Sequence, residues 1–185
     1  MDHDLDRPDG LWYVAYGSNL STVRFQEYLD GCRARVRSTI RRPTALRHRL
    51  FFADHSRRWG GGPAFVDPAM VADADTRATA WLLDRSQFLD VLAMENGVSI
   101  GSLDDVALPD DVGSTRIVAA GRYGRVVAVD SPDSRLAFTF TTGEQPLPSP
   151  TRPGPAYVEV IVAGLVADHG MTAAEARSYL AERGA

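Results

Sequence analysis

The pattern of hydrophobic and polar residues predicts short strands separated by helices. An apolar, aromatic-rich run at Leu11–Ala15 is typical of a buried strand. Along 46–53 apolar and polar positions alternate, which places one set of side chains on a single face: Leu46, His48, Leu50 and Phe52. His48 is expected to be a hydrogen-bonded residue on that face, because no second metal-binding residue follows at a useful spacing.

The same periodicities predict the other elements. Strands are expected at 36–40, 64–66, 76–83, 116–123, 125–129 and 135–142, and helices at 22–29, 86–96, 156–169 and after Thr172. Ser21 and Ser86 are placed to cap helices, and Thr172 forms a capping box with Glu175. The strand at 135–142 is apolar at nearly every position, which predicts burial on both faces or a place in a closed sheet.

The first strand leads into the segment Tyr16-Gly17-Ser18-Asn19-Leu20. Gly17 permits backbone conformations closed to other residues, and the following helix presents its N-terminus, so backbone N–H groups here could converge on an anion. The alternative is an ordinary turn between a strand and a helix, since Gly, Ser and Asn are common turn residues.

Three further positions carry candidate chemistry. Glu95 follows Phe88 and Leu92 on one helical face, so it either approaches the interior, where its pKa would rise, or lies at the helix edge in solvent. The glycines after Trp59 form a slack connector or a place where the backbone approaches a ligand or another strand closely. Tyr157 belongs to an apolar stripe of the helix at 156–169, as a core aromatic or as part of a pocket.

Composition narrows the possible function classes. The 185 residues suit one domain at 11–185 after an acidic lead-in at 1–10 that we expect to be disordered. A net charge of −4 argues against general nucleic-acid binding, although seven arginines between 33 and 49 form a local cluster that includes Arg33, Arg35 and Arg37. Apolar runs are too short to span a membrane, and no secretory signal is evident, so a cytoplasmic protein is expected.

The reactive side chains present exclude several mechanisms. The chain contains no lysine, which excludes a Schiff base, and its one cysteine, Cys32, excludes an intrachain disulfide and a multi-cysteine zinc site. Cys32 has no His at a recognisable spacing and is expected to be inert. A nucleophile elbow requires a glycine two residues after its serine, and Leu20 stands at that position after Ser18.

Four segments in order resemble the γ-glutamylcyclotransferase-like family. They are Tyr16–Leu20, Trp59–Ala64, Glu95–Gly101 and Pro155–Gly164. The family has Glu-Gly-Val and then Gly-x-Tyr, whereas this chain has Glu95-Asn96-Gly97-Val98 and then Leu103 at the tyrosine position. The resemblance implies an α+β fold with a small, mixed, barrel-like sheet flanked by helices. The missing tyrosine places the identity of the substrate in question more than the chemistry.

The resemblance also implies a reaction without metal or cofactor. A γ-glutamyl amide would cyclise to 5-oxoproline and a free amine, with Glu95 as general base and then acid. Gly17, Ser18 and Asn19 would bind the substrate, and Tyr16, Leu20, Trp59 and Tyr157 would shape the pocket. The expected partners are this small molecule and, in a homodimer, a second copy of the chain; a monomer is equally compatible.

Two other functions remain open at this stage. The same pocket could serve an amide hydrolase or deacylase of a related small metabolite, with Glu95 activating water. A non-catalytic module could instead have kept the loop and lost turnover.

Overall fold

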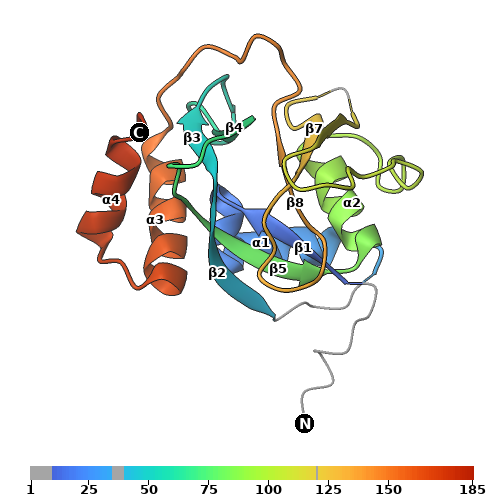
Figure 1. The fold of residues 1–185 in the computed structure, drawn as a ribbon. Coiled ribbons are helices and arrows are strands. Elements are labelled where there is room, and N and C mark those ends of the chain that lie inside the picture. The colour runs from blue at the N-terminus through green and yellow to red at the C-terminus, as the bar shows by residue number, and fades with distance from the viewer. Residues whose placement is uncertain (1–9, 35–39, 120) are drawn as a thin grey trace. The chain divides into compact units, whose positions relative to one another are not determined.

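The computed structural model describes residues 10–34, 40–119 and 121–185. Within these ranges are eight strands and four α-helices, together with a short 3-10 helix, η2 (Figure 1). The strands are β1 (Leu11–Ala15), β2 (Arg41–Leu46), β3 (His48–Phe52), β4 (Ala64–Met70), β5 (Thr76–Leu83), β6 (Thr115–Ile117), β7 (Arg125–Ala128) and β8 (Ala137–Thr141). The helices are η2 (Ser18–Leu20), α1 (Thr22–Gly31), α2 (Arg85–Glu95), α3 (Pro155–His169) and α4 (Ala173–Ala181).

The predicted α+β class with a mixed sheet is confirmed. Six strands form one sheet in the order β2-β5-β1-β8-β7-β6, and β3 pairs with β4 in a separate antiparallel sheet. β1 runs parallel to β8, whereas β7 is antiparallel to both β8 and β6. The expected barrel-like closure is wrong, because the described strands form an open sheet with β2 and β6 at its edges.

The chain packs as two compact units, each built from three separated segments. The first unit contains the described parts of Met1–Val14, Gln26–Arg42 and Ala80–Gly143, and the second contains Ala15–Phe25, Pro43–Thr79 and Glu144–Ala185. A single domain over 11–185 therefore stays a prediction.

An aromatic core holds the first unit together. Tyr13 of β1 stacks on Phe140 of β8 with ring centroids 4.9 Å apart, and Phe88 of α2 packs 5.8 Å from Phe138. Every residue of β1 and β8 is buried. The expectation that the strand at 135–142 is buried on both faces is thus confirmed for 137–141, in an open sheet.

Both ends of α2 carry specific caps. Asp84 is the N-cap, in a capping box with Gln87, so the expected cap at Ser86 is wrong. At the other end the N–H of Gly97 bonds to the Met94 carbonyl and that of Val98 to the Ala93 carbonyl, the paired bonds of a Schellman motif. Gly97 has φ +65°, the left-handed conformation that this motif requires. The predicted end at Asn96-Gly97 is confirmed.

The predicted strand at 116–123 is too long. β6 stops at Ile117, which pairs with Arg125 at the start of β7. Gly124 is the one residue between the two predicted strands, and a single residue cannot connect paired strands. The described residues between 118 and 124 supply the turn instead, and the Val118 N–H bonds to the Gly124 carbonyl. Residues 129–136 join the two antiparallel strands β7 and β8.

The second unit contains the β3–β4 pair and the two C-terminal helices. Leu46, His48, Leu50 and Phe52 are all buried, but Arg47 divides the expected strand into the end of β2 and β3, which belong to different sheets. The ring of His48 hydrogen-bonds to the Asp67 carbonyl at 2.9 Å. The capping box of Thr172 and Glu175 starts α4, which packs beside α3 (Figure 1).

Some expectations fall on residues that the structure does not describe. These are positions 1–9 of the lead-in, 36–39 of the strand at 36–40, and Arg35 and Arg37. Over the described part of the chain, no helix is long and apolar enough to cross a membrane.

Candidate functional site

The loop after β1 is a single tight turn that leads into α1. Tyr16 is buried, and Gly17 begins the 3-10 turn, whose carbonyl accepts the Leu20 N–H at 3.0 Å. Ser21 then caps α1 as predicted, because its Oγ accepts the Arg24 N–H at 3.4 Å. The loop is therefore fixed both by its own turn and by the helix that follows.

Tyr157 of α3 lies directly against this loop. A Cβ atom built on Gly17 would stand 2.8 Å from the Tyr157 Oη, so the side-chain hydroxyl occupies the space that any larger residue at 17 would need. The same hydroxyl accepts the Ala64 N–H at 3.1 Å. Trp59 packs on the Tyr157 ring with centroids 5.0 Å apart. Three of the four segments on which the family resemblance rests therefore meet at one tyrosine.

The glycine loop after Trp59 is a place of close backbone approach. A Cβ on Gly61 would lie 2.4 Å from the Gly154 nitrogen, and one on Gly62 would lie 2.3 Å from the Thr151 carbonyl oxygen. The Gly62 N–H donates to the Arg152 carbonyl at 2.8 Å. Of the two sequence interpretations, the slack connector is wrong and the close approach is confirmed. The loop fastens the segment before α3, and so positions Tyr157.

A second glycine contact joins α3 to the same loop. A Cβ on Gly164 would stand 2.5 Å from the Leu20 Cβ, so this glycine allows α3 to pack against the 3-10 turn. Tyr157 is 2% exposed, and its hydroxyl supports the loop backbone. Its observed role is thus that of a core residue beneath the candidate site.

Glu95 is the last residue of α2, in the first unit. Phe88, Val91 and Leu92 of its helical face are completely buried, and Glu95 itself is partly buried. The observed exposure of its side chain is thus intermediate between the two predicted positions, the interior and the solvent-exposed helix edge. The shared site of Glu95 and the Tyr16–Leu20 loop remains a prediction.

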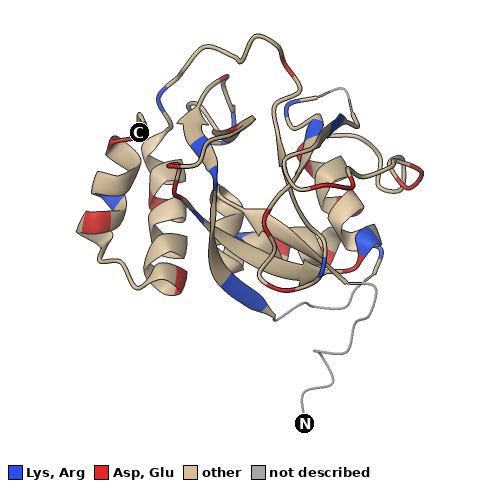
Figure 2. Ribbon diagram, viewed as in Figure 1, with Lys and Arg blue, Asp and Glu red and all other residues tan. Residues whose placement is uncertain are grey.

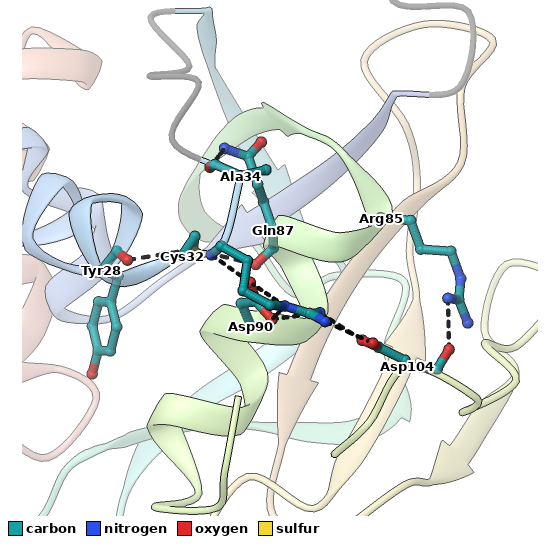
Figure 3. A network of polar contacts seen from close by, with 8 residues as sticks. Tyr28, Cys32, Ala34, Arg85, Gln87, Asp90 and Asp104 are labelled. Carbon is teal, nitrogen blue, oxygen red and sulfur yellow. Dashed lines mark hydrogen bonds and ion pairs between the residues drawn. The ribbon is translucent and has the colours of Figure 1, made fainter. Parts of the chain in front are cut away.

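A polar network anchors α2 to the segments on either side of it (Figure 3). Asp90, whose side chain is fully buried, accepts the backbone N–H of Arg33 at 2.9 Å and its guanidinium Nη2 at 2.8 Å. The other side of that guanidinium reaches Asp104 at 2.6 and 2.7 Å. These bonds hold the pKa of the Asp104 carboxyl below its usual range. The sequence placed Arg33 only in a local arginine cluster and did not indicate this role.

Cys32 lies in the same network and is unsuited to nucleophilic attack. Its side chain is 3% exposed, and burial raises the pKa of the thiol to about 12. The thiol donates weakly to the Tyr28 carbonyl. A thiolate is the reactive form of cysteine, so this residue is inert near neutral pH, as the sequence predicted.

Other members of the arginine cluster pack against aromatic rings. Figure 2 shows basic residues at the start of β2, where the Arg41 guanidinium lies 5.6 Å from the Trp81 ring and that of Arg42 lies 5.3 Å from the Trp12 ring. Such cation–π contacts are stabilising in themselves, so packing on the aromatic rings is a sufficient role for both arginines. Across the described ranges, no group of three or more His, Cys, Asp or Glu side chains is placed to hold a metal ion.

Comparison with solved structures defines the fold. The chain has the γ-glutamylcyclotransferase-like fold, as the Tyr-Gly-Ser-Asn-Leu segment indicated. A γ-glutamyl cyclotransferase superposes with a TM-score of 0.55 and 18% identity, over 91% of this chain and 85% of that chain. A human protein titled uncharacterized protein loc79017 gives a TM-score of 0.58 at 17% identity, over 92% and 86% of the two chains. YkqA from Bacillus subtilis gives 0.51 at 18% identity, over 85% of this chain and 48% of that one.

Sequence comparison gives a different kind of relative. The chain is 30% identical over 208 aligned residues to histone deacetylase 5 of Arabidopsis thaliana, an alignment that covers 96% of this chain and 31% of that protein. The chain thus spans about a third of the length of this relative. No protein-family model matches the chain.

Proposed function

We propose that this protein is a γ-glutamyl cyclotransferase that converts a γ-glutamyl amide to 5-oxoproline and a free amine without a cofactor. In this proposal Glu95 is the general base and then the general acid. Gly17, Ser18 and Asn19 hold the substrate through the turn that they form, and Tyr16, Leu20 and Trp59 line the pocket. Tyr157 shapes the pocket from below by fixing where Gly17 lies.

The observation that carries the proposal is the arrangement around the Tyr157 hydroxyl. This hydroxyl contacts the Gly17 turn and the Ala64 N–H, and the ring of the same tyrosine packs on Trp59. Three segments that resemble the same family, although distant in sequence, are therefore held together. The likeness in fold to a solved γ-glutamyl cyclotransferase supports the same reaction class.

The reaction requires the protein to hold the substrate in a folded conformation and to transfer protons from the substrate ammonium to the leaving nitrogen. Glu95 takes a proton from the substrate α-ammonium, and the freed amine attacks its own γ-carbonyl carbon to form the ring C–N bond. The protonated Glu95 then gives the proton to the leaving nitrogen as the amide C–N bond breaks, and the second proton lost by the ring nitrogen passes to the released amine, which leaves as an ammonium ion. The N–H groups of the Gly17 turn are suited to stabilise the negative charge on the carbonyl oxygen in between.

The decisive variant is Glu95→Gln, which removes the proton acceptor and keeps the shape of the side chain. We expect kcat for 5-oxoproline release to fall by roughly 10²–10⁴-fold, the usual contribution of a general acid–base group. The melting temperature should change by no more than about 2 °C. Product formation is measured by mass spectrometry over a panel of γ-glutamyl amides.

Glu159→Gln is the matched control, since Glu159 lies on α3 in an exposed pair with Arg177. It should retain wild-type turnover. An E95Q protein as active as E159Q would remove Glu95 from the mechanism. Glutamate release without 5-oxoproline would favour the amide hydrolase, and a γ-glutamyl compound that raises the melting temperature without being consumed would favour the binding module.

A further inference from the structure

Asn96 follows the proposed catalytic residue and is the residue by which this chain departs from the Glu-Gly-Val pattern. Its side chain makes three hydrogen bonds, all to backbone atoms. The carboxamide Nδ2 donates to the Leu92 carbonyl at 2.9 Å and to the Tyr123 carbonyl at 3.2 Å. The Oδ1 atom accepts the Tyr123 N–H at 2.9 Å. One side chain thus pairs with both backbone groups of Tyr123 and with the last turn of α2.

The segment that receives Asn96 is shaped for it. Gly121 has φ +152°, and a Cβ built there would lie 2.3 Å from the Asn96 Oδ1 and 3.1 Å from the Asn96 Cβ. An alanine at 121 would therefore displace the carboxamide. Gly121 leaves space for the Asn96 side chain, and the two residues form a close contact between α2 and the turn before β7.

This contact is continuous with the aromatic core of the first unit. The Tyr123 ring packs edge-on against Phe140 at 5.5 Å, and Phe140 stacks on Tyr13 of β1 at 4.9 Å. The Schellman motif caps the last turn of α2 through bonds to the next two residues of the chain. Through Tyr123 this turn is in addition attached to β8 and to β1, the strand that leads in sequence to the Tyr16–Leu20 loop.

We infer that Asn96 is a positioning residue for Glu95, which clamps the C-terminal turn of α2 to Tyr123 and so fixes the backbone from which the carboxylate projects. The inference rests on the proposed function of Glu95. A general base must be held close to its productive geometry, and a displacement of about 1 Å can cost on the order of a hundredfold in rate. The loss of the clamp should therefore appear in kcat, whereas substrate binding by the Gly17 turn is left intact.

The test is Asn96→Ala, which removes all three hydrogen bonds and leaves Glu95 in place. We expect kcat for 5-oxoproline release to fall roughly ten- to hundredfold, with KM changed by no more than about twofold. The control is Asp84→Ala, which removes the N-cap from the other end of the same helix. Asp84→Ala should lower the melting temperature about as much as Asn96→Ala does, and it should leave kcat within about twofold of the wild type.

Gly121→Ala provides a second, independent variant because it acts on Asn96 from outside α2. It should lower kcat in the same way, but in the N96A background it should cause little further loss, since the carboxamide that it displaces is then absent. If N96A cannot be purified, Asn96→Asp, which keeps the Oδ1 acceptor, replaces it in the comparison.

The possible outcomes separate this inference from the proposed function. A wild-type protein that releases no 5-oxoproline, or an active E95Q variant, contradicts the proposed function and removes the basis for this inference. If the wild type is active and E95Q is not, a kcat for N96A equal to that of D84A overturns the positioning role alone.

Discussion

At the scale of single residues, the Tyr157 hydroxyl has the largest structural consequence in the candidate site. Its oxygen satisfies a buried backbone N–H of Ala64 and also sets the size limit at Gly17. A buried N–H left without a partner costs about 1–3 kcal/mol, whereas the hydroxyl itself is compatible with a largely apolar environment when it is bonded. One atom thus determines both the stability of the β4 start and the space in the loop.

The double substitution of Gly17 and Tyr157 tests this view. Tyr157→Phe should destabilise the protein by about 1–3 kcal/mol, because Ala64 loses its acceptor. Gly17→Ala should be strongly disruptive in the wild-type background and milder in the Y157F background, since the nearest remaining ring atom, Cζ, lies 4.0 Å from the new Cβ. Thermal unfolding of the two single variants and the double variant measures the coupling.

Tyr179→Phe is the control for Tyr157→Phe. The Tyr179 hydroxyl also accepts a backbone N–H, that of Arg77 at 2.9 Å, but in a partly exposed place that water can reach. The change should cost less stability than Y157F and leave the coupling with G17A near zero. Equal coupling in both pairs would contradict the direct contact between Gly17 and Tyr157.

Individual residues also show what the sequence could and could not predict. The burial of Leu46, His48, Leu50 and Phe52 follows from period-two alternation, and it was predicted correctly. The bond from Ala64 to Tyr157 joins residues 93 positions apart, and no local pattern specifies such a partner. Asn96 carried a signal, because it interrupts a recognised motif, but its partner at Tyr123 depends on tertiary structure.

At the scale of elements, α2 is held more firmly than its length would suggest. It has a capping box at its start, a Schellman motif at its end, and the fully buried Asp90 carboxylate bonded to Arg33 between them. The Arg33 side chain is 45% exposed, so only the carboxylate of this pair is buried. Removing the arginine is costly because that carboxylate loses its charged partner in a medium of low polarity. The Arg33 contact should therefore matter more to stability than an exposed pair of the same geometry.

Arg33→Ala and Arg177→Ala provide that comparison. Arg177 makes two hydrogen bonds to Glu159 at 2.8 and 2.9 Å, with both side chains about half exposed. We expect R33A to lower the melting temperature by roughly 5–10 °C and R177A by about 2 °C or less, as measured by calorimetry. A similar change in both variants would show that the Asp90 pair acts as a surface ion pair.

Element boundaries were predicted best where one local signal acts alone. Thr172 and Glu175 form a capping box without a competing residue, and the start of α4 was predicted correctly. Before α2 two candidates compete, Asp84 with Gln87 and Ser86, and the reciprocal pair prevailed because it satisfies two backbone groups at once. The strand at 116–123 was overextended, since apolar composition does not reveal that the described residues of 118–124 must turn the chain.

At the scale of the whole molecule, the order of the segments bears on the number of domains. Each compact unit is assembled from three separated stretches, so the chain passes back and forth between the two. β2 and β5 each contain residues of both units, with boundaries after Arg42 and after Thr79. Independent domains usually meet at one or two linkers with few contacts across them. A chain that divides in the middle of its strands is expected to unfold as one cooperative structure.

Hydrogen exchange at increasing denaturant concentration tests this expectation. Peptides from α2 report on the first unit and peptides from α3 on the second. For a single domain the two sets should lose protection at the same denaturant midpoint, because the shared strands cannot open in one unit alone. Midpoints separated by more than the error would instead define two domains. In that case R33A, which acts within the first unit, should move only the α2 midpoint, whereas in a cooperative domain it should lower both equally.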